Sequence, residues 1–375
     1  MVKKLLVCCL LGAVTSVAAQ ADVSIVEQRH VGKMLGGQPK SGDKKHSPPT
    51  KATGSQGLID NSGLKYFINT NITFSTTSSA SGAMSEASYT HAVAATTLNG
   101  GTTSSTLNDA FDGYNTLCLS LNNTVANCET GNANFEIYNK EGPATTECLG
   151  ATSGVNRQVV FPASLEGVIS VQRKVFVPDN DSFARWMNYF TNTSGAPVTV
   201  TAVIANNLGS DSNTQIVTSS NGNATAETTD TWISSFQAYS GTTSSDVRLA
   251  HVLQGAGAGV PMSGINFVNG DDNPFWGYTF NLNPGETKIV VNFVVGQPSK
   301  AAANAKATAL ATATPWTGAQ AACMTPTEMA QVANFSNVNA VPIVTIPTMG
   351  GIGLGVLALA LLAGSLWILR RRAQA

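Results

Sequence analysis

Short apolar stretches separated by turn residues run through the middle of the chain. Residues 198–204 (VTVTAVI) alternate apolar and polar side chains over most of their length, the period of a strand with one buried face. Residues 168–177 are rich in β-branched side chains, and residues 283–285 (NPG) are one of several turn-forming clusters. Many short strands with few helical segments predict a mainly β fold, an antiparallel β-sandwich over residues 61–298.

The first part of this region differs in composition from the rest. Residues 64–151 have fewer aromatic residues and more Ser, Thr and Ala. The sequence leaves two arrangements open, because this part is either a first sandwich that ends near residue 152 or the outer half of one large sandwich. Further strands are expected at residues 184–190, 231–239, 248–253, 275–282 and 287–295.

Two short helices are predicted after the last strand, within residues 299–336. Residues 300–313 are rich in alanine and have high helix propensity. The second helix begins with Thr325 at the N-cap, Pro326 at the first helical position and Glu328 at the third, which is a capping box.

The N-terminal residues 1–21 have the pattern of a secretory signal peptide. A basic start precedes an apolar run of about 15 residues, which is too short to cross a bilayer as a helix. Ala19 and Ala21 supply the small residues that signal peptidase requires, with cleavage after Ala21. Residues 22–60 are rich in Gly, Pro and Lys and lack an apolar period, so they are predicted to form a disordered arm.

The C-terminal part predicts a membrane span. Residues 349–369 contain no charged residue, and a helix of that length reaches roughly 31 Å, enough to cross the hydrocarbon core. An uncharged stalk and motif at residues 337–348 precede it. Residues 370–375 form a basic tail that favours the cytoplasmic side and leaves the bulk of the chain outside. The tail begins with Arg370, Arg371 and Arg372.

The order of these C-terminal parts resembles a known sorting signal. Ile346, Pro347, Thr348 and Met349, followed by the apolar span and the arginines, resemble the IPTL-CTERM signal of Gram-negative surface proteins. Met349 stands where that family has Leu. The resemblance, confined to residues 346–375, implies that an exosortase-type membrane enzyme removes the span. It also implies secretion machinery as a partner and a route from an inner-membrane intermediate to the cell surface or extracellular matrix.

Four cysteines remain after removal of the signal peptide: Cys118, Cys128, Cys148 and Cys323. An even number in an exported chain predicts two disulfides, with three possible connectivities. A strand and turn between the first two favour the pairing Cys118–Cys128. The second disulfide, Cys148–Cys323, would then tie the C-terminal segment to the sandwich.

Charge excludes one class of function and leaves candidates for others. Charged residues make up 11% of the chain, against about 25% in an average protein, and a net charge of −1 gives no basic footprint for nucleic acid. The Ser- and Thr-rich surface offers sites for glycans. No cofactor is expected. Loop carboxylates that are weak candidates for Ca²⁺ are Asp179, Asp181, Asp271 and Asp272.

Residues suited to carbohydrate chemistry are present but not clearly paired. His251 lies in a predicted strand and is expected to be structural, which leaves His91 as the other candidate base outside the arm. Tryptophans that suit either sugar stacking or core packing are Trp186, Trp232 and Trp276. Carboxylates available for a glycosidase-like pair are Asp181, Asp230, Asp272 and Glu286. The sequence predicts a non-enzymatic, structural or adhesive surface protein, with a carbohydrate-binding module or carbohydrate-active enzyme as the alternative.

Overall fold

The computed structural model describes residues 54–70, 80–94, 104, 106–108, 110–128, 132–138, 143–237, 246–336 and 338. The predicted signal peptide, most of the predicted arm, the sorting motif, the predicted membrane span and the basic tail lie outside these residues. Within them, no helix is both long enough and apolar enough to cross a membrane.

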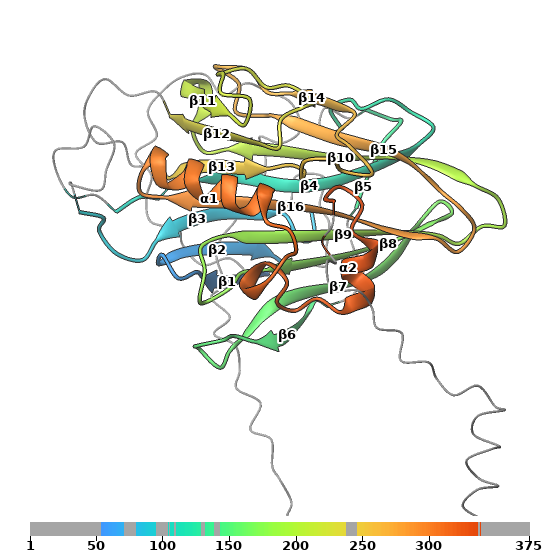
Figure 1. Ribbon diagram of the computed structural model, residues 1–375, viewed down its shortest axis with the longest axis horizontal. Coiled ribbons are helices and arrows are strands. Elements are labelled where there is room, and N and C mark those ends of the chain that lie inside the picture. The colour runs from blue at the N-terminus through green and yellow to red at the C-terminus, as the bar shows by residue number, and fades with distance from the viewer. Residues whose placement is uncertain are drawn as a thin grey trace, which may run out of the picture. The chain divides into compact units, whose positions relative to one another are not determined.

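Strands dominate the described chain and form two antiparallel sheets (Figure 1). The first sheet has the order β1-β2-β3-β4-β10-β15-β14, with β5 paired to β4. Its strands are β1 (Ser55–Ile59), β2 (Leu64–Asn69), β3 (Met84–Tyr89), β4 (Phe111–Leu121), β5 (Glu136–Ile137), β10 (Val198–Leu208), β14 (Gly264–Asn266) and β15 (Phe275–Leu282).

The second sheet has the order β11-β12-β13-β16-β9-β8-β7-β6. Its strands are β6 (Thr145–Leu149), β7 (Asn156–Glu166), β8 (Ile169–Phe176), β9 (Ala184–Asn192), β11 (Thr214–Ser219), β12 (Trp232–Gln237), β13 (Arg248–Val252) and β16 (Thr287–Gln297). A 3-10 turn, η2 (Asp211–Asn213), precedes β11. The predicted mainly β, sandwich-like fold is therefore confirmed, and each strand expected from the sequence is present. The predicted arm at residues 22–60 is wrong at its end, because Ser55–Ile59 pair with β2 as strand β1 and so begin the sandwich before residue 61.

The two sheets form one large sandwich. Strand β4, from the Ser- and Thr-rich first part of the chain, pairs with β10 over most of its length, with Cys118 opposite Val203. Strands β1 to β5 thus complete a sheet whose other strands come from residues 198–282. Of the two arrangements left open by the sequence, the structure has the single large sandwich.

Apolar side chains from both sheets fill the space between them. Trp186 of β9 and Trp276 of β15 belong to this core, with 0% and 1% of their surfaces exposed. Trp232 is 8% exposed and packs on the opposite face of the second sheet. All three predicted tryptophans are therefore packing residues, because a buried indole cannot stack on a sugar.

The chain after β16 lies across the outer face of the second sheet, and we call residues 299–336 the C-terminal strap. Helix α1 (Lys300–Thr312) runs over β13 and β16 (Figure 1) and buries Ala303, Ala307 and Leu310. A 3-10 turn, η3 (Gly318–Gln320), and helix α2 (Pro326–Gln331) follow. The predicted helix at residues 300–313 and the predicted capping box are both confirmed.

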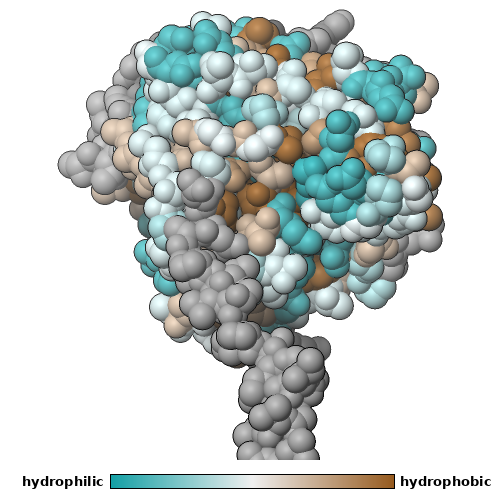
Figure 2. Space-filling model, turned by 45° about the vertical axis from the view of Figure 1, so that its right-hand side comes forward, coloured by the Kyte–Doolittle hydropathy of each residue, from teal (hydrophilic) through white to brown (hydrophobic). Residues whose placement is uncertain are grey.

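The strap gives the second sheet an additional apolar layer. Phe293 of β16 lies against Trp316 and Phe335 of the strap, with ring centroids 5.4 and 5.8 Å away. Because such aromatic contacts add to the burial of their area, the strap is an integral layer of the fold. The surface in Figure 2 mixes polar and apolar residues, with apolar patches interrupted by polar ones.

Candidate functional site

Two disulfides fasten the sandwich. Cys118 and Cys128 join β4 to the loop after it, across 10 residues. Cys148 of β6 and Cys323 of the strap are 175 residues apart in sequence. Both predicted pairings are confirmed, and the second brings the strap to the edge strand of the second sheet.

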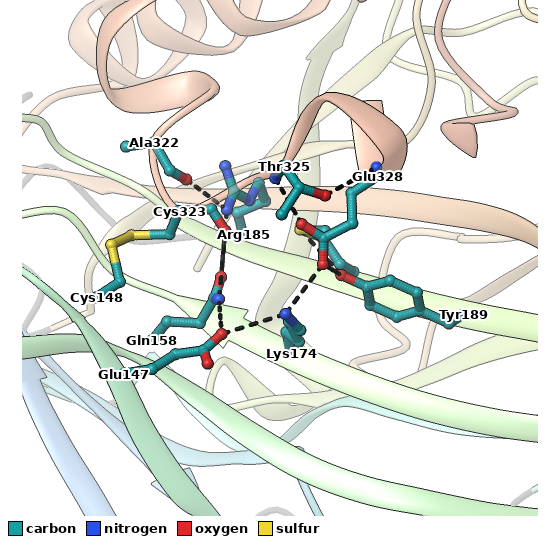
Figure 3. Close-up of polar contacts among 11 residues, drawn as sticks. Glu147, Cys148, Gln158, Lys174, Arg185, Tyr189, Ala322, Cys323, Thr325 and Glu328 are labelled. Atoms are coloured by element: carbon teal, nitrogen blue, oxygen red, sulfur yellow. Dashed lines mark hydrogen bonds and ion pairs between the residues drawn. A yellow bond between two sulfur atoms is a disulfide. The ribbon is translucent and has the colours of Figure 1, made fainter. Parts of the chain in front are cut away.

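A polar cluster lies beside the second disulfide, between the strap and the outer face of the second sheet (Figure 3). The Lys174 ammonium is 3.2 Å from Glu147 Oε1 and 2.9 Å from Glu328 Oε1. Tyr189 donates its hydroxyl proton to Glu328 Oε1 at 2.5 Å. Gln158 donates to Glu147 Oε1 at 2.7 Å. We call these five residues the Lys174 cluster.

Strand and helix geometry explains how these side chains meet. Lys174 alternates with the inward-facing Arg173 on β8 and so points outward, toward the strap. Glu328 is the third residue of α2 and accepts the Thr325 backbone N–H at 2.7 Å, as its place in the capping box requires. The capping residue therefore also serves as the ion-pair partner of the sheet.

Lys174 and Glu328 are both charged at neutral pH. Burial acts to raise the pKa of Glu328, but hydrogen bonds from Thr325, Tyr189 and Lys174 outweigh it and hold that pKa below its usual value. Burial acts to lower the pKa of Lys174, but the interactions with Glu328 and Glu147 outweigh it and raise that pKa. Burial and the bond to Glu328 raise the pKa of the Tyr189 phenol, so it acts as a hydrogen-bond donor.

Glu147 is the accessible member of the cluster. Its side chain is 48% exposed, whereas those of Lys174 and Glu328 are 16% and 11% exposed. Glu147 and Glu328 share one ammonium, so the lysine lies between the two carboxylates. The sequence singled out Glu328 only as a capping residue and did not single out Glu147, since residues 147 and 328 have no shared spacing signal.

A buried arginine holds the strap from below. Arg185 of β9 is fully buried and donates to the backbone oxygens of Gln320 and Ala322, the second at 2.9 Å. Its guanidinium also lies 4.8 Å from the ring of Phe176. The strap carbonyls therefore receive charge-assisted hydrogen bonds, which are stronger than neutral ones.

Asn334 fastens the last described part of the strap. Its side-chain amide accepts the Val291 N–H at 2.8 Å and donates to the Val291 carbonyl at 2.7 Å, as a neighbouring strand would. The same nitrogen donates to the Leu253 oxygen at 2.9 Å. Ala333 adds a backbone bond to Ile289. The sequence offered no signal for this contact, because a single asparagine in a loop has no diagnostic spacing.

His251 is a core residue. Tyr114 Oη lies 2.8 Å from its Nδ1 and Ser235 Oγ lies 2.9 Å from its Nε2. The ring is fully buried, and burial lowers its pKa to about 3. The imidazole is therefore neutral and a weak base at pH 7, so this arrangement does not activate Ser235 as a nucleophile. His91 is exposed, with its ring 5.7 Å from that of Tyr89.

The first pair of candidate Ca²⁺ carboxylates bonds to N–H donors instead. Asp179 accepts the backbone N–H groups of residues 151, 152 and 153 at 2.9, 3.0 and 2.6 Å. The pKa of this carboxyl lies below its usual value, because these bonds and the neighbouring hydroxyls outweigh its slight desolvation. Asp181 pairs with Lys306 of α1. Both carboxylates thus stabilise local structure.

The second candidate pair lies in an acidic neighbourhood. Burial raises the pKa of Asp272 to about 7, and the nearby Asp211, Asp112 and Asp271 add to the effect. In the described ranges, no group of three His, Cys, Asp or Glu side chains is arranged to hold a metal ion. Of the other carboxylates considered, Asp230 accepts from the backbone of Glu227 and Glu286 pairs with Lys288.

Comparison with known proteins gives the fold wider context without naming a family. No family model and no curated protein matches the chain. A polysaccharide lyase structure is similar at 13% identity and TM-score 0.35. A heparan sulfate lyase mutant from Pedobacter heparinus is similar at 11% and 0.33, and a galactose mutarotase-like protein from Lactobacillus casei at 8% and 0.35.

The extent of these similarities differs between the neighbours. The matches cover 64%, 66% and 65% of this chain, but only 34% and 37% of the two lyases, against 100% of the mutarotase-like protein. At such identities and TM-scores they assign no substrate or reaction. They do contradict the expectation from sequence that the chain is not an enzyme, since solved chains with a similar arrangement include lyases, and we withdraw that expectation.

Proposed function

We propose that this chain is an exported protein whose β-sandwich is displayed at the cell surface through its C-terminal segment. The observation that carries the proposal is the attachment of the strap, which leads toward the predicted sorting motif. A disulfide at Cys323, the Arg185 contacts and the Asn334 pairing all fasten it to the second sheet. A C-terminal tail that is recognised at the membrane would then be connected firmly to the whole sandwich through the strap.

The two disulfides support the same proposal. Disulfides form and persist in oxidising compartments such as the periplasm and the cell exterior. Cys148 lies on the exposed edge strand β6, where a reducing cytosol would leave it as a thiol. Signal peptide, disulfides and sorting motif are thus consistent with one route.

Mass spectrometry of the C-terminal peptide tests the display. Protein recovered from the surface of its native host is expected to end within residues 346–350, without the apolar span and arginines. Pro347→Ala is expected to retain the full tail, because proline keeps the motif extended and outside the helix. Pro342→Ala, in the stalk, is the matched control and should be processed normally. An end at Ala375 in the unsubstituted protein would refute the sorting step.

The second candidate function concerns what the displayed sandwich does, and we propose that it is carbohydrate-active or carbohydrate-binding. The specific observation is the accessible Glu147 carboxylate, which contacts the lysine that it shares with Glu328. Sugar hydroxyls can donate to such a carboxylate and accept from the lysine. Glu328 is already saturated with donors, so the chemistry would depend on Glu147.

Incubation of the full chain with a polysaccharide panel tests this candidate. The readouts are new reducing ends, the ultraviolet absorbance of unsaturated uronic acids, and binding on a glycan array. Glu147→Gln should abolish the response, while Glu286→Gln, which removes a carboxylate from a separate, half-buried ion pair, should keep it. A panel without cleavage or selective binding would rule the candidate out.

A further inference from the structure

The end of the strap, residues 332–336, occupies a position that a neighbouring strand would take. Strand β13 ends at Val252, opposite Phe293, so it does not reach the earlier residues of β16. Val332 forms a parallel bridge with Ile289 on this edge of β16, and the Asn334 side chain continues the pairing at the next position but one. We call residues 332–336 the strap end.

A glycine-rich loop at residues 255–259 (GAGAG) also lies against the strap end. The loop and the residue after it form three hydrogen bonds with the strap end: Gly255 N–H to the Asn334 oxygen at 2.9 Å, Val260 N–H to the Ala333 oxygen at 2.8 Å, and Ser336 Oγ to the Ala256 oxygen at 2.5 Å. The strap end is therefore bonded on one side to β16 and on another to this loop.

The close approach of the loop depends on glycine at one position. A Cβ at Gly255 would lie 2.7 Å from Phe335 Cδ1 and 3.3 Å from Phe335 Cα. The Phe335 ring cannot move freely, because it packs on Trp316 with centroids 5.0 Å apart. At Gly259 a Cβ would lie 3.5 Å from the Ala333 oxygen, an ordinary contact. The two glycines thus differ in how tightly they contact the strap end.

The Cys148–Cys323 disulfide lies between the strap end and the rest of the fold along the chain (Figure 3). A pull on the C-terminal tail enters at Ser336 and reaches Cys323 only through residues 324–336. Fully extended, these residues reach at most about 45 Å, whereas the whole strap, residues 299–336, would reach about 130 Å. The disulfide is covalent, so it withstands loads that break hydrogen bonds.

We propose that the strap end and the glycine-rich loop form a force-bearing clamp, and that the Cys148–Cys323 disulfide is its stop. Tension on the tail first loads the hydrogen bonds of residues 332–336. When they open, the strap extends only as far as Cys323, and both sheets keep their strands. The use of the clamp rests on the proposed display, since only a tethered tail transmits force, but the clamp belongs to the folded chain and is testable apart from it.

Force spectroscopy of the full chain tests the stop. One handle is inserted in the exposed turn at Gly195, where an added Cβ meets no atom within 4 Å, and the other follows Ala375. The unsubstituted protein should lengthen first in a step of at most about 45 Å. A variant with serine at Cys148 and Cys323 should extend further in that step, to about 130 Å. Steps of equal length in the two proteins would overturn the stop.

Loop variants test the clamp. At constant force Gly255→Ala should shorten the time before the first step about tenfold, because its methyl group displaces Phe335. Gly259→Ala is the matched control and should leave that time unchanged. If Gly255→Ala does not fold, Ser336→Ala removes one half-buried hydrogen bond and should shorten the time several-fold.

Equal times in the unsubstituted protein and in each folded variant would overturn the clamp and leave the sorting step unaffected. A C-terminal peptide that ends at Ala375 on the native host would instead refute the sorting step. It would not alter the force-extension result, so the two failures are distinguishable.

Discussion

Replacing both Cys148 and Cys323 with serine removes the disulfide that joins β6 to the strap. That disulfide closes a loop of 175 residues, whereas Cys118–Cys128 closes a loop of 10. In the chain-entropy treatment the long loop contributes about 5 kcal/mol and the short one about 2.7 kcal/mol to the free energy of unfolding. The long-loop double variant should therefore be the less stable by about 2 kcal/mol.

The strap should nevertheless stay in place in that variant. Arg185 still donates to the strap carbonyl of Ala322, and Asn334 of the strap still accepts the Val291 N–H. Phe335 remains packed on Phe293. Since a domain of this kind has a free energy of unfolding of about 5–15 kcal/mol, a folded protein is expected. Local release of the strap would instead expose Glu328, the one glutamate in the strap.

Two measurements decide the outcome. Urea unfolding, followed by tryptophan fluorescence, gives the free energy of unfolding of this variant and of a second double serine variant at Cys118 and Cys128. The two losses are then compared. Digestion with a glutamate-specific protease reports cleavage after Glu328, which should stay slow in both variants. Equal losses, or a larger loss for the short loop, would refute the argument from loop length. Rapid cleavage only in the long-loop variant would show that the disulfide, rather than the polar contacts, retains the strap.

Three further predictions concern single polar side chains. His251 has a pKa of about 3 in the fold against an ordinary 6.5. Its neutral ring therefore contributes fully to the free energy of unfolding above pH 6.5, and that free energy falls by roughly 5 kcal/mol as the pH drops to 3. His251→Gln should flatten this part of the stability curve, measured by urea unfolding at pH 7 and pH 4. Thr325→Ala removes the cap of α2 and should cost about 1 kcal/mol, while Thr325→Ser should cost little; an equal loss for both would contradict a capping role. Asn334→Ala removes the side-chain partner of the Val291 N–H and C=O, while the Leu253 oxygen keeps Tyr278 and Asn292 as donors. The loss should be roughly 1–3 kcal/mol in urea unfolding, and no loss would show that water replaces the amide.

Local sequence was sufficient for much of the architecture. The alternation at residues 198–204 and the β-branched residues at 168–177 correspond to β10 and β8, because the period of two is set by the pleat of any strand. The capping box at Thr325 and Glu328 is likewise local, since its two hydrogen bonds join residues three apart. The cysteine pairing followed from the strand and turn between Cys118 and Cys128.

Contacts between distant segments were beyond such reasoning. Arg173 meets Asn115 across 58 residues, Lys174 meets Glu328 on the strap, and Arg185 reaches Ala322 across 137 residues. No periodicity specifies which buried donor finds which acceptor, because that depends on the stacking of two sheets and a strap. The expected sorting tail is a linear motif and could be read from residues 346–375 alone. The polar clusters arise only when folding forces buried charges and amides to find partners.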